Sequence, residues 1–310
     1  MINRRKILKN TLLLSLSSPY AISQAISEIS FKNKNIILKK IPSSQEEIPV
    51  IGMGSWLTFD VGYDKKELKE RKNILQVFFE KGGAIIDSSP MYGRSERVIG
   101  KCLRLLNNEK LNLFSASKIW TPNNWHGKKQ FENSQDFWGI KKFSLMQVHN
   151  LVNYEGHLDY LHELKKRGMV RYIGITTSHG WRHEKLKFIM ENYKIDFVQL
   201  TYNIIDTEAE KFLLPLAKER KIAVIANRPF QGGKLFNYVK NKKVPAQFKE
   251  YGVSNWSELF LKYVVSNSSI TCTIPATSKV QHMHENMNSL YGYLPSDKER
   301  IRLKKFFLDA

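Results

Sequence analysis

Short, continuous runs of apolar and often β-branched residues recur along the chain and predict strands that are buried on both faces. These runs lie at 48–54, 83–89, 111–118, 141–150, 170–177, 196–203, 222–230 and 268–276. Between most of them, apolar residues recur three and four positions apart, which predicts amphipathic helices. The expected helices span 65–82, 95–106, 157–168, 183–193, 207–220, 254–267 and 279–290. A further apolar run at 35–41, joined to 48–54 by polar turn residues, predicts an N-terminal β-hairpin.

This regular alternation of strand and helix over roughly 250 residues favours an α/β fold of the (β/α)8 barrel type, a TIM barrel. An open, doubly wound sheet is the alternative, but no G-x-G-x-x-G fingerprint follows the first strand. Two stretches without a clear period, 119–130 and 231–253, are expected to be long loops. Since no linker-like segment interrupts the pattern, we expect one barrel domain over residues 26–310.

Residues 1–25 have a basic start, an apolar middle and a small-residue end, which is the layout of an export signal. The apolar run is too short to cross a bilayer, so no stable membrane span is expected. Arg4 and Arg5, followed by Leu8 and Lys9, resemble the paired arginines of twin-arginine signals. We therefore expect the export machinery to recognise Arg4 and Arg5 and to deliver the protein to a bacterial periplasm. A general secretory signal and a merely basic terminus are the alternatives.

The composition is that of a soluble globular protein, with 42% hydrophobic and 25% charged residues, but the net charge is +20. Such a charge can indicate a nucleic-acid partner. The basic residues are, however, spread along the whole chain without a block of like charges, so a lysine-rich surface and no nucleic acid is the preferred interpretation. Cys102 and Cys272 fall in different predicted elements, and we expect free, buried thiols and no metal site.

Three of the predicted strands end in ionisable residues. Asp87 ends the strand at 83–89, with Tyr92 in the following loop, and Lys118 and His149 end the next two strands. In a (β/α)8 barrel these strand ends share one mouth, so the four side chains are expected to meet. There Asp87 would keep Lys118 charged, and Lys118 would lower the pKa of the Tyr92 phenol. A proton donor and a neutral histidine aimed at one oxygen are what carbonyl reduction requires.

In these residues the chain from about 36 to 290 resembles the aldo-keto reductase family, (β/α)8 barrel enzymes that use NADPH or NADH. The family's catalytic Asp, Tyr, Lys and His match Asp87 and Tyr92 in IIDSSPMYG, Lys118 in SASKIW and His149 in QVHN. The resemblance implies reduction of an aldehyde or ketone to an alcohol, with Tyr92 as the proton donor. NADPH is the expected cofactor and NADH the alternative.

The resemblance also implies a set of cofactor-binding residues. In the first strand and at the nicotinamide, these are Gly54, Ser55, Trp56, Thr176, Thr177 and Gln199. At the pyrophosphate and adenosine, they are Arg228, Phe230, Gly233, Leu235, Thr277, Ser278, Lys279, His282, Glu285 and Asn286. Some of these residues depart from the family's pattern. Thr176 and Thr177 stand where the family has Ser-Asn. Arg228 replaces the serine of an aromatic–serine pair, and His282 replaces an arginine.

An alternative from another class is a nicotinamide-binding redox sensor or regulatory barrel with little turnover. The sequence names no particular carbonyl substrate. His126, His157 and His183 have no motif around them and are expected to lie on the surface.

Overall fold

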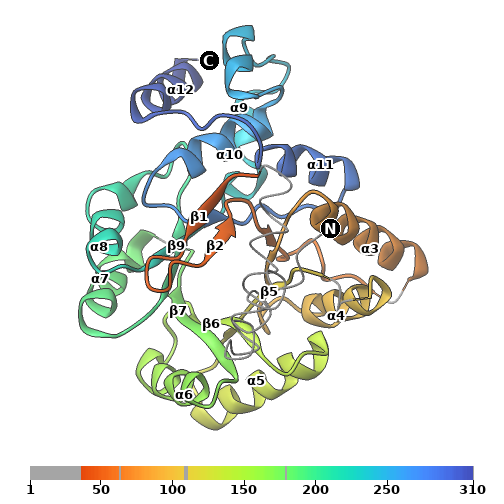
Figure 1. The fold of residues 1–310 in the computed structure, drawn as a ribbon, viewed down its shortest axis with the longest axis vertical. Helices are drawn as coiled ribbons and strands as arrows, with labels where there is room; N and C mark the ends of the chain where they lie inside the picture. The colour runs from red at the N-terminus through yellow and green to blue at the C-terminus, as the bar shows by residue number, and fades with distance from the viewer. Residues whose placement is uncertain (1–35, 63, 108–110, 179, 310) are drawn as a thin grey trace, which may run out of the picture.

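The structure, a computed structural model, describes residues 36–62, 64–107, 111–178 and 180–309. The expected export signal at 1–25, with Arg4 and Arg5, lies outside these residues. Eight parallel strands follow one another around a barrel, and helices cover the outside (Figure 1). The predicted (β/α)8 fold is confirmed.

Each barrel strand is hydrogen-bonded to the next strand along the chain. The strands are β3 (Met53–Gly54), β4 (Ile85–Asp87), β5 (Phe114–Ile119), β6 (Phe143–His149), β7 (Val170–Thr176), β8 (Phe197–Thr201), β9 (Ala223–Asn227) and β10 (Cys272–Thr273). Parallel bridges from Ile51 to Thr273 and from Gly54 to Ala276 join the first strand to the last and close the ring. A Cβ on Gly54 would lie 2.9 Å from the Ile274 carbonyl oxygen, so glycine is needed for this close approach.

The outer layer is helical. It consists of α3 (Lys65–Glu80), α4 (Ser95–Leu105), α5 (Asn124–Trp138), α6 (Tyr154–Lys166), α7 (His183–Asn192), α8 (Leu213–Glu219), α10 (Trp256–Ser266) and α11 (Val280–Asn288). The expected loop at 231–253 contains the short helix α9 (Leu235–Tyr238) and two 3₁₀ turns, Gln231–Gly233 and Ala246–Tyr251. Further 3₁₀ turns, Gly180–Arg182 and Glu208–Glu210, precede α7 and α8.

Two helices contradict the sequence-based expectations. The stretch 119–130 is not one loop, because α5 begins at Asn124 and Asn123 caps its first turn by accepting a hydrogen bond from the His126 amide. Its buried residues include Gly127 and Ser134, so the sequence carries only a weak apolar stripe. The last helix, α12 (Asp297–Asp309), was missed for the same reason, since its buried residues are Leu303 and Phe307.

The N-terminal hairpin is confirmed and closes one end of the barrel. Strands β1 (Leu38–Lys40) and β2 (Glu47–Pro49) pair antiparallel, and they lie across the centre of the ring in Figure 1. The expected strand at 48–54 is therefore divided between this hairpin and β3. Ile41 and Ile48 join the apolar cluster inside the barrel, which includes Phe114 and Phe197 at the first positions of their strands. Because these residues lie at the N-terminal strand ends, the C-terminal end is the open one.

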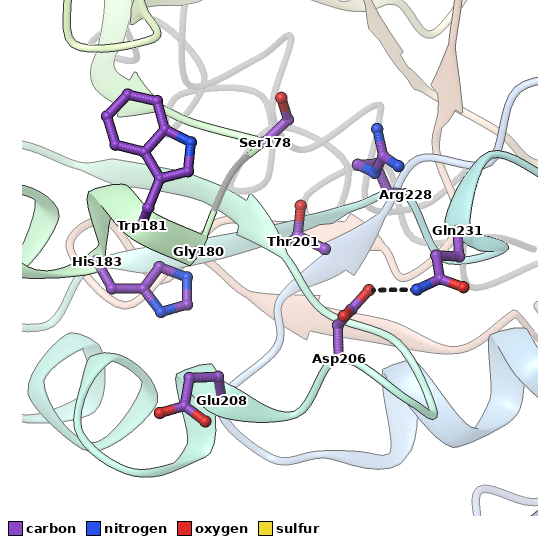
Figure 2. A pocket seen from close by; sticks show the side chains of 9 residues that line it. All are labelled: Ser178, Gly180, Trp181, His183, Thr201, Asp206, Glu208, Arg228 and Gln231. Carbon is purple, nitrogen blue, oxygen red and sulfur yellow. Dashed lines mark hydrogen bonds between the residues drawn. The ribbon is translucent and has the colours of Figure 1, made fainter.

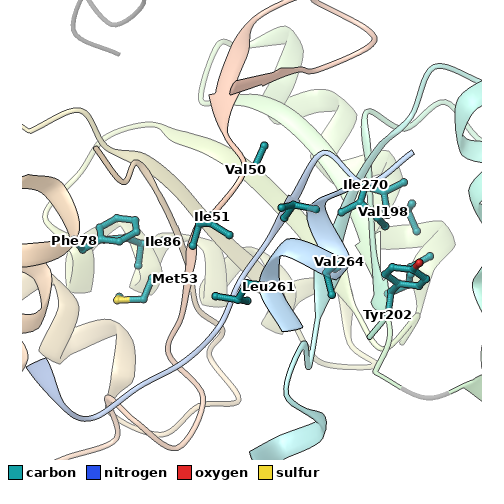
Figure 3. Close-up of a cluster of buried hydrophobic side chains, with 14 of the residues drawn as sticks. Val50, Ile51, Met53, Phe78, Ile86, Val198, Tyr202, Leu261, Val264 and Ile270 are labelled. Atoms are coloured by element: carbon teal, nitrogen blue, oxygen red, sulfur yellow. The ribbon is translucent and has the colours of Figure 1, made fainter. Parts of the chain in front are cut away.

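A larger apolar layer lies between the strands and the helices (Figure 3). Some polar side chains are also buried under the helices, and Glu96 is one of them. Glu96 of α4 accepts hydrogen bonds from Ser117 of β5 at 2.6 Å and from Ser134 and Trp138 of α5 at 3.1 and 3.0 Å. Burial raises the pKa of the Glu96 carboxyl, and these three donors oppose that rise. The cluster joins α4, α5 and β5 across the barrel wall.

The thiols of Cys102 and Cys272 are free and buried, as predicted. His126 is exposed, but the surface placement is wrong for His157 and His183, which are both buried. His157 lies inside because its Nε2 is 2.7 Å from the Thr121 carbonyl oxygen, which satisfies one ring nitrogen.

No helix within the described ranges is long and apolar enough to cross a membrane. The same ranges contain no cluster of three His, Cys, Asp or Glu residues suited to a metal ion.

We expect Gly100→Ala to destabilise the protein by about 3 kcal/mol, the upper end for overpacking. A Cβ on Gly100 in α4 would lie 1.8 Å from the Phe137 carbonyl oxygen of α5, and a helix backbone cannot yield as a side chain can. Gly156→Ala in α6 is the matched control, because its Cβ would meet the movable Asn124 side chain. Urea denaturation measures both, and equal losses would contradict the tight α4–α5 contact.

Candidate active site

A buried ion pair lies at the open end of the barrel. Asp87 is the last residue of β4, and Lys118 lies on the neighbouring strand β5. Lys118 Nζ is 2.5 Å from Asp87 Oδ2, and the two side chains are 0% and 2% exposed. Nζ also donates to the Ser88 carbonyl oxygen at 2.7 Å. Because side chains alternate along a strand, Ser117 points outward to Glu96 while Lys118 points into the barrel.

The second oxygen of Asp87 is also fully used. Asp87 Oδ1 accepts hydrogen bonds from Gln147 Nε2 at 3.1 Å and from Gln199 Nε2 at 3.0 Å. Gln199 Oε1 in turn accepts from Thr176 Oγ1 at 2.8 Å. Sequence reasoning missed Gln147, although it lies two residues before His149 on β6 and therefore on the same face. The carboxylate thus receives donors from three other strands, β5, β6 and β8.

Tyr92 and His149 complete the cluster. Their rings meet edge to face with centroids 5.6 Å apart, and Lys118 Nζ lies 5.1 Å from the centroid of the Tyr92 ring. His149 Nδ1 is 2.8 Å from Ser89 Oγ, which also accepts a hydrogen bond from the Met91 amide at 3.2 Å. The structure therefore brings together the four residues of the expected tetrad and adds Ser89, which lies within the IIDSSPMYG motif.

Burial and charge fix the protonation of these groups. Burial raises the pKa of Tyr92, and this effect exceeds the lowering by Lys118, so the phenol differs from the expectation of a lowered pKa. Burial would lower the pKa of Lys118, but Asp87 and Tyr92 outweigh it and the net shift is upward. Burial, followed by the charges of Lys118 and Arg182, lowers the pKa of His149 to about 2. At neutral pH the phenol is protonated, the ammonium charged and the imidazole neutral.

The residues expected at the first strand and the nicotinamide lie around this cluster. Ser55 is buried and its hydroxyl donates to the Asp87 carbonyl oxygen at 3.0 Å. The Thr177 carbonyl oxygen accepts from Asn227 Nδ2 at 3.1 Å. Both ends of the Gln199 amide are bonded within the protein, to Thr176 and Asp87. Trp56 is 44% exposed.

The residues expected at the pyrophosphate follow β9. Arg228 has a left-handed backbone with φ of 51°, and Gly233 has φ of 90°, so this segment turns sharply. Leu235 is fully buried, and the Phe230 ring packs against the Phe236 ring with centroids 5.1 Å apart. Leu235 and Phe230 therefore hold the segment in place through core contacts.

The residues expected at the adenosine follow β10. Ser278, Lys279 and His282 are exposed, and Lys279 occupies the N-cap position of α11. Thr277 is buried and its Oγ1 accepts from the Lys279 amide at 3.1 Å. Gln281 Nε2 donates to Glu285 Oε1 at 3.2 Å. Asn286 Oδ1 accepts from Ser257 at 2.8 Å, whereas Asn286 Nδ2 is buried without a hydrogen-bond partner among the residues that the structure describes.

A polar cavity of about 300 Å³ lies between the loops that follow β7, β8 and β9. Its lining consists of Ser178, Gly180, Trp181, His183, Thr201, Asp206, Glu208, Arg228 and Gln231. Figure 2 shows Trp181 and His183 on one side and Arg228 and Gln231 on the other. Arg228 therefore faces this cavity, and Asp206 lies on the same side, where its Oδ2 accepts a hydrogen bond from Gln231.

Comparisons with known proteins assign this arrangement to a family. The sequence profile of the "Aldo/keto reductase family" matches residues 50–303. The chain belongs to the aldo/keto reductase family. It is 22% identical over 289 residues to "Uncharacterized oxidoreductase YqkF" of Bacillus subtilis (strain 168), which covers 81% of this chain and 90% of that protein. "Probable aldo-keto reductase 1" of Glycine max is 21% identical over 291 residues, covering 81% and 83%.

A solved structure of the family shares the fold. An aldo/keto reductase from Klebsiella pneumoniae, in complex with NADP and acetate, matches with a TM-score of 0.71. The sequences are 19% identical, and the match covers 85% of this chain and 93% of that one.

We expect Asp87→Asn to lower the free energy of unfolding by roughly 3 kcal/mol, because the variant leaves the buried Lys118 ammonium without a counter-charge. Urea denaturation measures the change. The control is Glu163→Gln, whose partner Arg167 lies 3.6 Å away in an exposed pair, and it should cost less than about 1 kcal/mol. Similar losses in both variants would show that the buried pair contributes no more than a surface pair.

Proposed function

We propose that this protein is an NADPH-dependent reductase that converts an aldehyde or ketone to an alcohol. The observation that carries the proposal is the cluster of Tyr92, Lys118, Asp87 and His149 at the open end of the barrel. Membership of the aldo/keto reductase family supports it. The Klebsiella pneumoniae relative binds NADP, which supports the choice of nucleotide.

Tyr92 is the proton donor in this mechanism. Its pKa is raised by burial, so the phenol carries its proton at neutral pH. As negative charge develops on the substrate oxygen, the Lys118 ammonium beside the ring stabilises the phenolate that remains after proton transfer. Asp87 keeps Lys118 charged and in place, and Gln147 and Gln199 hold Asp87.

His149 orients the substrate oxygen. Since Ser89 Oγ accepts a hydrogen bond from the Met91 amide, its own hydroxyl hydrogen is available to donate to His149 Nδ1. The neutral ring then carries its proton on Nε2, which donates to the carbonyl oxygen. Ser89 thus selects the tautomer of the ring.

NADPH, when bound, supplies the hydride. The described residues fit this nucleotide at its adenosine end. Asn286 Nδ2 is a buried donor without a partner, which suits a polar edge of adenine. Ser278 and Lys279 are exposed at the N-terminus of α11, where a hydroxyl, an ammonium and the helix dipole all favour a 2′-phosphate. At the pyrophosphate, Arg228 offers a guanidinium that can bind a phosphate oxygen.

We expect Tyr92→Phe to lower kcat for aldehyde reduction by at least about 10²-fold, the lower end for loss of a general acid. The substitution keeps the ring and removes only the hydroxyl, so the Kd for NADPH should change little. Steady-state kinetics with a generic aldehyde and a fluorescence titration with NADPH measure the two quantities. Wild-type turnover in the variant would refute the role of Tyr92. Tight NADPH binding without turnover in the wild type would instead favour the redox-sensor alternative.

The rate of reduction should be independent of pH across roughly pH 6–9 and decline only above about pH 10. A proton donor is lost as pH rises through its pKa, and burial places the pKa of Tyr92 above its usual value. No decline is expected in mild acid, because His149, with a pKa of about 2, stays neutral there. Values of kcat/KM at saturating NADPH give the profile. A transition near pH 6–7 would show that His149 titrates in the working range.

A further inference from the structure

One arginine near the proposed reduction site has a buried nitrogen without a hydrogen-bond partner among the described residues. Arg182 lies in the 3₁₀ turn Gly180–Arg182, which follows the C-terminal end of β7. Its Nη1 atom is buried without a hydrogen-bond partner in the described chain, and its guanidinium lies 4.2 Å from the centroid of the Trp181 ring. Stacking on an aromatic face holds the guanidinium plane while leaving its N–H groups available.

Several other arginines of the protein already have a carboxylate partner. Arg71, Arg94, Arg171 and Arg300 each lie within ion-pair distance of a carboxylate. Arg182 takes part in no ion pair among residues 36–62, 64–107, 111–178 and 180–309. A buried N–H donor without a partner costs roughly 1–3 kcal/mol, more when it is charged, so such a group suits a ligand that satisfies it.

The turn places this charge close to the reacting centre. Thr176, the last residue of β7, is the register partner of His149 on β6, and Arg182 follows six positions later. The positive charge of Arg182 reaches the imidazole, where it adds to burial and Lys118 in lowering the pKa of His149. Arg182 and the proposed carbonyl-binding nitrogen therefore belong to the same part of the mouth.

The acidic residues that line the neighbouring cavity, Asp206 and Glu208, form no ion pair with Arg182 in the part of the chain that the structure describes. Asp206 Oδ2 accepts from Asn203 Nδ2 at 2.8 Å. Glu208 Oε1 lies 2.8 Å from Lys211 Nζ.

We propose that Arg182 forms a carboxylate-binding subsite, so that the preferred substrates are aldehydes or ketones that also carry a carboxylate. A planar guanidinium binds a carboxylate through paired hydrogen bonds and would fix the distance between that group and the carbonyl. This inference rests on the proposed reductase function, to which it adds a substrate class.

The test compares an anionic and a neutral substrate built on the same ring, 4-carboxybenzaldehyde and its methyl ester, methyl 4-formylbenzoate. The wild type should have the higher kcat/KM for the acid. In Arg182→Gln the ratio of the two kcat/KM values should fall by roughly tenfold or more, the effect of one charge-assisted hydrogen bond. Arg182→Lys keeps the positive charge but loses the planar guanidinium with its paired N–H donors, so it should retain part of the preference for the acid. Equal loss for acid and ester in Arg182→Gln would overturn the proposal.

Arg167→Gln is the matched control and should keep the wild-type ratio. Arg167 is an exposed arginine at the C-cap of α6, at the opposite end of the barrel from the mouth. The Kd for NADPH is measured for all variants. If Arg182→Gln weakens NADPH binding as much as it lowers the preference for the acid, Arg182 binds the nucleotide and the proposal fails. Thermal melting confirms that each variant is folded.

A binding experiment separates this inference from the proposed function. Benzoate and benzamide are titrated into wild type, Arg182→Gln and Tyr92→Phe while tryptophan fluorescence is followed. Tighter binding of benzoate in the wild type and in Tyr92→Phe, but not in Arg182→Gln, supports the subsite even if no aldehyde is reduced. No preference for benzoate in the wild type overturns the subsite and leaves the reductase function untouched.

Discussion

A lysine ammonium buried completely inside a barrel is the constraint around which the mouth of this protein is arranged. Removing such a charge from water is expensive unless a counter-charge and hydrogen-bond acceptors replace the solvent. Asp87 supplies the counter-charge at 2.5 Å and the Ser88 carbonyl supplies an acceptor. The carboxylate must then be satisfied as well, which accounts for the two glutamine amides that converge on it.

The same buried environment gives three titratable groups different protonation states. The pair keeps Lys118 charged, burial keeps the Tyr92 phenol protonated, and burial together with nearby cations keeps His149 neutral. Each state suits its proposed role, since a donor needs a proton and an orienting ring needs to stay uncharged next to an ammonium. The low polarity of the site thus sets the chemistry as much as the identity of the residues does.

The barrel was predictable from the sequence because continuous apolar runs alternate with helical periods, and the strand ends then bring Asp87, Lys118 and His149 to one mouth. Helices with few buried apolar residues, α5 and α12, were not predictable from the same periodicity. The pKa direction of Tyr92 depends on burial, which no local pattern reveals.

The contacts made by Gln147 and Ser89 could not be read from the sequence either. Each joins residues 60 positions apart, Asp87 with Gln147 and Ser89 with His149. Only the register between neighbouring strands, which the fold supplies, places them within hydrogen-bond distance. Local motifs therefore indicated which side chains reach the mouth, whereas their hydrogen-bond partners required the structure.

The hairpin that seals the N-terminal end of the barrel has a kinetic consequence. With Ile41 and Ile48 packed into that end, the barrel interior can be reached only from the C-terminal side. Two ligands that enter through the same opening cannot pass each other. The ligand that binds deeper must therefore bind first and dissociate last. Where one ligand covers another at this mouth, release of the covered ligand has to wait until the covering ligand has left.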